Sequence, residues 1–118
     1  MAVDNHQLQF NQIQGELTNA ENARMEGNEG MARVCSRRAV GIAVSIYLSH
    51  NGFTDFGASA YERLNILKTL PNISPQVVEI AEHLLLRVNE DHKLPIDIDL
   101  IAEARWLIDH LLSDIQIR

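Results

Sequence analysis

Arg87 and His92 are separated by four residues at the predicted end of a helix. A guanidinium can hold a phosphate group and stabilise the charge that develops on it, and an imidazole can move a proton near neutral pH. Such a pair suits metal-free cleavage of RNA, in which the 2′-hydroxyl attacks its own phosphate. The acidic neighbours Glu90 and Asp91 favour a protonated histidine but repel RNA phosphate. The alternative is a solvated helix end in which Arg87 pairs with a nearby carboxylate.

The densest cluster of positive charge consists of Arg33, Arg37 and Arg38. Arg33 and Arg37 are one helical turn apart and therefore share a face, and Arg24 could approach them across the preceding turn. This cluster predicts a phosphate or anion site. The alternative is that neighbouring acids such as Glu29 neutralise the arginines, because the chain is acidic overall.

Other residues that could bind a metal or react have simpler interpretations. Glu79 and His83 are one turn apart and could share a metal ion, but two ligands are too few, so a surface polar pair is predicted. Cys35 is the single cysteine and lies on an apolar helix face, which predicts a buried thiol rather than a nucleophile. The chain has no glycine-rich phosphate loop, no His-Glu-x-x-His helix and no Gly-x-Ser-x-Gly elbow, so no metal and no cofactor is predicted.

The elements that must position these residues are predicted to be helices. Apolar residues recur at helical spacing in every long segment, and no segment alternates as a strand would. Turn residues separate the segments, and Ser74 followed by Pro75 is a helix start in which the serine caps the helix. The first four predicted helices cover about residues 4–26, with Asp4 as cap, 31–50, 58–70 and 74–90. The last predicted helix is capped by Asp97 or Asp99 and carries an apolar stripe from Ile98 to Ile115.

These helices predict an all-α fold in a single domain spanning residues 1–118. Short connections favour an antiparallel up-down helical bundle, with four long helices and one short helix at about residues 58–70. The second helix is rich in small and apolar residues, which predicts that it is central. A chain this short can carry more apolar helix surface than one core absorbs, and this predicts a homodimer.

Composition narrows the classes of function. The formal net charge is −6, which opposes tight, non-specific binding to nucleic acid. Apolar residues make up 46% of the chain but never form a run long enough to span a membrane, and the start of the chain has no signal-peptide pattern. The predicted location is therefore cytoplasmic, with no membrane contact.

Three features occur together in this chain: a Gly27-Asn28 turn before a small-residue helix (Ala32–Leu48), a helix break from Pro71 to Pro75, and the Arg87–His92 segment followed by Ile96–Ile101. In this combination the chain resembles the HEPN domains, small helical bundles associated with prokaryotic nucleotidyltransferases and toxin systems. Catalytic members of that family are metal-independent ribonucleases whose motif arginine and histidine meet across a dimer interface. The resemblance implies these catalytic roles for Arg87 and His92.

Other members of the family are non-catalytic and bind a partner protein or a nucleotide. Here Val88 and Leu94 occupy positions where many active members have a polar residue and a tyrosine. Together with the negative charge, this favours a non-catalytic helical interaction or nucleotide-binding module of prokaryotic type, with a nucleotidyltransferase as a possible protein partner. The alternatives are a HEPN-like ribonuclease acting on RNA as a dimer and a structural homodimer.

Overall fold

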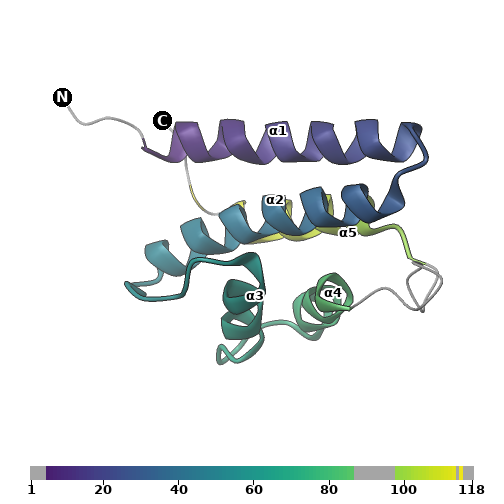
Figure 1. Cartoon of the computed structure of the whole chain (residues 1–118). Helices are drawn as coiled ribbons and strands as arrows, with labels where there is room; N and C mark the ends of the chain where they lie inside the picture. Colours follow the sequence, from purple (N-terminus) through teal and green to yellow (C-terminus); the bar gives the residue numbers. More distant parts are fainter. Residues whose placement is uncertain (1–4, 87–97, 114, 116–118) are drawn as a thin grey trace.

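The computed structural model describes residues 5–86, 98–113 and 115, and the regular structure in them is entirely helical. Helices make up 77% of these residues and no strand occurs among them, which confirms the predicted all-α class. The caps considered at Asp4 and Asp97 lie outside the described residues. Figure 1 shows the helices, which are α1 (Asn5–Met25), α2 (Glu29–His50), α3 (Ala60–Lys68), α4 (Pro75–Leu85) and α5 (Leu100–Leu112).

Side-chain caps set the starts of α2 to α5. Ser74 Oγ accepts a hydrogen bond from the N–H of Val77 at 3.2 Å, which confirms the predicted cap of α4. Asp99 caps α5, because its Oδ1 accepts from the N–H of Ala102 at 3.1 Å. Such bonds satisfy N–H groups that have no partner within the first turn. The two other helices are capped in the same way by Asn28 and Ser59.

The lengths of the helices depart from the expected division. α1 and α2 have 21 and 22 residues, whereas α3, α4 and α5 have 9, 11 and 13, so four long helices and one short helix are not confirmed. α4 was expected to continue to about Glu90 but ends at Leu85, and Leu86 is extended with φ −62° and ψ 144°. The carbonyl groups of Leu84 and Leu86 at this end accept hydrogen bonds from arginines of α2, which satisfies acceptors that have no partner within the helix.

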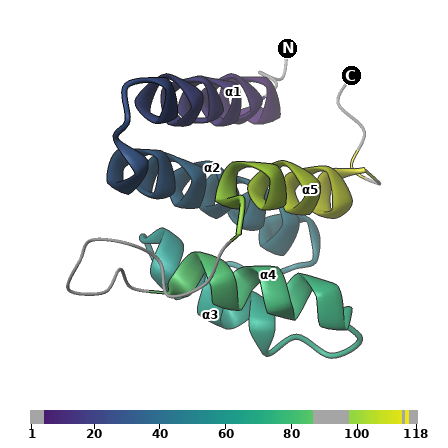
Figure 2. The same ribbon diagram turned by 90° about the vertical axis from the view of Figure 1, so that its right-hand side faces the viewer.

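The arrangement has three layers, with α2 at the centre (Figure 1). α1 and α2 form an antiparallel hairpin, α5 lies along α2, and α3 with α4 forms the layer opposite α1. α4 is seen nearly end-on in Figure 1 and from the side in Figure 2, so it crosses the direction of α1 and α2. A simple antiparallel up-down arrangement is therefore not confirmed.

The core is aliphatic and surrounds α2. Its largest fully buried side chains come from every helix, and half of the residues of α2 are buried. The apolar surface of α2 that suggested a dimer is thus covered by the other helices of the same chain. A smaller cluster holds α1 to the start of α2 and to α5 and consists of Ala20, Ala23, Ala32, Cys35 and Ile101. Cys35 is buried, as predicted.

No helix within the described ranges is both long enough and apolar enough to span a bilayer.

Candidate ligand-binding site

The predicted catalytic pair, Arg87 and His92, lies outside the described residues. The ribonuclease interpretation therefore stays a prediction from the sequence. The candidate sites that follow are built only from side chains that the structure places.

The predicted arginine cluster is divided between two sides of α2. Arg33 and Arg37 share a face and reach the end of α4, in agreement with their spacing. Arg38 follows Arg37 by one residue and therefore points about 100° away around the helix. It is exposed and lines a hollow beside α1 and α3 instead. Arg24 does not join the cluster, because it pairs with Glu29 and Asp99.

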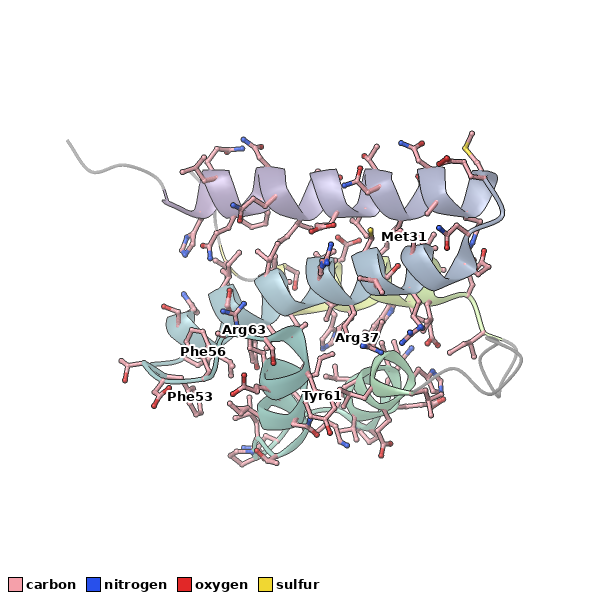
Figure 3. The ribbon with its side chains drawn as sticks, in the orientation of Figure 1. Met31, Arg37, Phe53, Phe56, Tyr61 and Arg63 are labelled. Atoms are coloured by element: carbon pink, nitrogen blue, oxygen red, sulfur yellow. The ribbon has the colours of Figure 1, made fainter. Side chains whose placement is uncertain are left out.

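Arg33 and Arg37 hold the carboxyl-terminal end of α4 (Figure 3 labels Arg37). Arg37 Nε donates to the carbonyl of Leu84 at 2.7 Å, and Arg37 Nη2 and Arg33 Nη1 both donate to the carbonyl of Leu86 at 3.3 Å. Burial lowers the pKa of Arg37, and the neighbouring charge of Arg33 lowers it further. Neither arginine has a carboxylate within ion-pair distance in the described part of the chain. Glu29, which was considered as a partner that would neutralise these arginines, pairs with Arg24 instead.

On the other side of α2, Arg63 of α3 lines the same hollow as Arg38. Arg63 Nε donates to the carbonyl of Gly57 at 3.2 Å, and its Nη1 donates to the carbonyl of Gly41 at 3.4 Å. Its guanidinium also lies over the ring of Phe56, 5.6 Å from the centroid (Figure 3). Three contacts fix this side chain, and its remaining N–H groups are available to a ligand.

Two glycines make this placement of Arg63 possible. A Cβ on Gly41 would lie 2.7 Å from the Cβ of Ala60, so the close approach of α2 and α3 requires glycine there. Gly57 has φ +80°, and a Cβ on it would lie 2.7 Å from a carboxylate oxygen of Glu62. The carbonyl groups that hold Arg63 therefore both belong to residues that a larger side chain would displace.

Two hollows adjoin along α1, α2 and α3 and share Glu16 and Ile42 in their walls. The first has a volume of about 200 Å³ and contains Arg38, Gly41 and Arg63. The second has about 410 Å³ and is lined by polar residues of α1. We call the two together the α1–α2–α3 groove; its polar and charged lining residues are Gln12, Glu16, Asn19, Arg38 and Arg63.

Two residues of the groove wall, Glu16 and Arg38, carry opposite charges. The pKa of the Cys35 thiol is raised, first by burial and then by the negative charge of Glu16, while the positive charge of Arg38 opposes the rise. Glu16 and Arg38 therefore lie close enough to the same thiol to influence it. Cys35 itself is buried and lines neither hollow.

Two further polar groups are present away from the groove. His83 Nδ1 lies 2.7 Å from a carboxylate oxygen of Glu103 in α5, whereas His83 Nε2 lies 3.9 Å from Glu79. The closer partner of His83 is therefore Glu103 and not the predicted Glu79. A hollow of about 380 Å³ at the ends of α2 and α5 contains His50 and His110. No group of three or more His, Cys, Asp or Glu side chains that could hold a metal ion occurs in the part of the chain described by the structure.

Sequence reasoning missed Arg63. A lone arginine in a short helix carries no pattern, and one of its two partners, Gly41, is 22 residues away in the chain. The only local signal was a glycine six residues before it, Gly57.

No family model matches the chain, and no curated protein and no solved structure matches it either.

Proposed function

We propose that this protein is a non-catalytic helical module that binds a mononucleotide in the α1–α2–α3 groove. The observation that carries the proposal is the presence of two guanidiniums, Arg38 and Arg63, in the wall of one hollow. Neither forms an ion pair with a carboxylate among the described residues. Unpaired guanidiniums that face a common hollow suit a phosphate group, which accepts several charge-assisted hydrogen bonds.

The order of the groove residues suits the parts of a nucleotide. Arg38 and Arg63 lie in the first hollow and would hold the phosphate. Glu16 belongs to both hollows, and its carboxylate can accept hydrogen bonds from ribose hydroxyl groups. The amides of Gln12 and Asn19 lie in the second hollow and offer both donors and acceptors to the edge of a base.

Size and charge restrict the ligand further. The second hollow, of about 410 Å³, is in the range of small-molecule sites, which measure about 300 to 1,000 Å³, and the adjoining first hollow, of about 200 Å³, has room for a phosphate group. The carboxylate of Glu16 lies next to the phosphate position and repels additional negative charge. A nucleoside monophosphate is therefore favoured over a triphosphate or an RNA strand.

Calorimetric titration with the four nucleoside monophosphates tests this proposal. We expect at least one to bind, and its nucleoside to bind at least about tenfold more weakly, because a hydrogen bond to a charged group contributes roughly 1.5 to 3 kcal/mol. Arg38→Gln should weaken nucleotide binding by about the same factor without unfolding the protein, since Arg38 is exposed and makes no ion pair in the described structure. Arg63→Lys tests the second guanidinium while keeping the charge.

Arg105→Gln is the matched control. It removes the same charge from α5, where Arg105 pairs with Glu21 and lines neither hollow. Its nucleotide affinity should equal that of the native protein. The proposal fails if no nucleotide binds at millimolar concentration. It also fails if Arg38→Gln, like the control Arg105→Gln, keeps the nucleotide affinity of the native protein.

The remaining sequence-based expectations stay proposals. They are the HEPN-like resemblance, a homodimer, a protein partner such as a nucleotidyltransferase, and a cytoplasmic location. The large apolar side chains that are exposed in the described residues are spread over α1, its junction with α2, the loop after α2 and α3, namely Leu8, Met25, Met31, Phe53 and Tyr61. Their spread does not define one dimer face.

A further inference from the structure

A second hollow of about 380 Å³ lies where the ends of α2 and α5 meet the start of α4. α5 runs along α2 in the same direction, so both helices finish at the same end of the molecule (Figure 1). This hollow shares no lining residue with the α1–α2–α3 groove. Its volume is within the range of small-molecule sites, about 300 to 1,000 Å³. It is therefore a separate place in which a ligand could be held.

Polar side chains in the wall of this hollow have unused hydrogen-bonding groups. Within the described part of the chain, the imidazoles of His50 and His110 and the amide of Asn72 form no hydrogen bond or ion pair. The ring of His110 stacks on Trp106, with 4.8 Å between the centroids and 13° between the planes, and this stacking orients the imidazole. Stacking occupies the face of the ring and leaves its nitrogen atoms free for a ligand.

The charge of the lining residues restricts the ligand. None of the lining residues that the structure describes is acidic, so a cationic ligand would find no opposite charge. An imidazole takes up a proton near neutral pH and then donates from both nitrogen atoms, which suits an anion. A zinc ion needs three or four protein ligands, and the described residues contain no group of three that could supply them.

The form of the anion follows from the rest of the wall. No Arg or Lys of the described residues lines the hollow, so a doubly charged phosphate ester would lack the fixed positive charge that it prefers. Ile73 and Leu111 line the same space and offer apolar surface to a ligand. We propose that this hollow binds a small carboxylic acid, whose carboxylate accepts hydrogen bonds from His50 and His110 and whose apolar body lies against Ile73 and Leu111.

Titration with benzoate tests the proposal, and benzyl alcohol, which has the same ring without the charge, is the matched control ligand. Trp106 is the single tryptophan of the chain and contacts His110, so its fluorescence reports on the hollow. Calorimetry measures the affinity independently. We expect benzoate to bind at millimolar concentration and benzyl alcohol to bind at least about tenfold more weakly, because only the carboxylate forms charge-assisted hydrogen bonds.

Four variants locate the site. His50→Gln and His110→Gln should each weaken benzoate binding by about tenfold, and both residues are exposed at helix ends, so the fold should be kept. Asn72→Gly should weaken binding by about threefold, and glycine readily adopts the φ of +64° that Asn72 has. His6→Gln is the matched control, because His6 lines neither this hollow nor the groove, and it should keep the native affinity.

Four results would overturn the assignment. The first is no response to benzoate at high millimolar concentration, and the second is equal affinity for benzoate and benzyl alcohol, which would mean that the charge is not recognised. The third is native affinity in both His50→Gln and His110→Gln, or a loss of benzoate binding in Arg38→Gln, which would place the carboxylate in the groove. The fourth is a response to Zn²⁺ that both histidine variants remove, with none to benzoate, which would make the hollow a metal site.

Discussion

At the scale of single residues, the position of an arginine around its helix decides its role. Arg33 and Arg37 were predicted to share a face because they are one turn apart, and the structure confirms this. Their partners could not be predicted, because the carbonyl of Leu84 is 47 residues further along the chain. Arg38 belongs to the same sequence cluster but lies on another side of α2, so the cluster as a whole is not one site.

Asp99 gives a prediction about pH. Its pKa is lowered, first by the hydrogen bond from Arg24 and then by the N–H of Ala102 that it caps. A folded pKa below the unfolded value of about 3.9 means that the contribution of Asp99 to stability is present above this pH. It is lost as the pH falls through the lower, folded pKa. We expect Asp99→Asn to be less stable than the native protein near neutrality and to approach it in acid.

Urea unfolding of both proteins between neutral and acidic pH measures this difference. Asparagine keeps the capping oxygen, so the variant isolates the charge of Asp99. Arg24→Gln should show the same approach to native stability in acid, because it removes the other partner of the bond. A stability difference that stays constant over the whole pH range would mean that the ion pair of Asp99 does not contribute.

At the scale of elements, local chemistry predicted the helices better than it predicted their ends and directions. The cap at Ser74 follows from two neighbouring residues and is confirmed, and of the two aspartates considered for the last helix, Asp97 and Asp99, the structure shows Asp99 as the cap. The end of α4 depends on arginines of α2, and the crossing of α4 depends on the packing of the whole core, so neither could be obtained from the α4 sequence. The same reasoning explains why Arg63 was missed, since one of the two backbone groups that hold it is 22 residues away.

Two glycines inside helices allow a matched test of the contact between α2 and α3. Gly41→Ala would place a Cβ 2.7 Å from the Cβ of Ala60 and 3.0 Å from its Cα, so we expect it to destabilise the fold by about 1 to 3 kcal/mol. It should also weaken nucleotide binding, because the carbonyl of Gly41 holds Arg63. Gly15 has open space at its Cβ position, and Gly15→Ala should stabilise α1 by about 0.5 to 1 kcal/mol.

Chemical unfolding measures both variants, and the sign of the effect should differ between them. If Gly41→Ala were as stable as the native protein, α2 and α3 would not be in close contact, and the placement of Arg63 would have to be reconsidered. Loss of stability in Gly15→Ala would show instead that α1 does not tolerate the added side chain.

At the scale of the whole molecule, the net charge of −6 favours the binding of a mononucleotide over the binding of an RNA strand. A mononucleotide responds mainly to the local charges in the groove, where Arg38 and Arg63 face Glu16. An RNA strand extends beyond the groove and is repelled by the acidic remainder of the surface. RNA affinity also depends steeply on salt wherever many phosphates are neutralised, and this chain has few cations to neutralise them.

We therefore expect RNA oligonucleotides to bind no more tightly than the mononucleotide, and with little dependence on salt. Fluorescence anisotropy at low and physiological salt measures this. In EDTA we also expect no RNA cleavage, and His92→Ala should leave nucleotide affinity unchanged, because the polar and charged side chains of the proposed groove belong to α1, α2 and α3. Cleavage in EDTA that His92→Ala abolishes would establish the ribonuclease alternative with Arg87 and His92 as its pair. Cleavage that persists in that variant would come from a contaminant or from another site, since a metal-free mechanism at this pair requires the imidazole to move the proton.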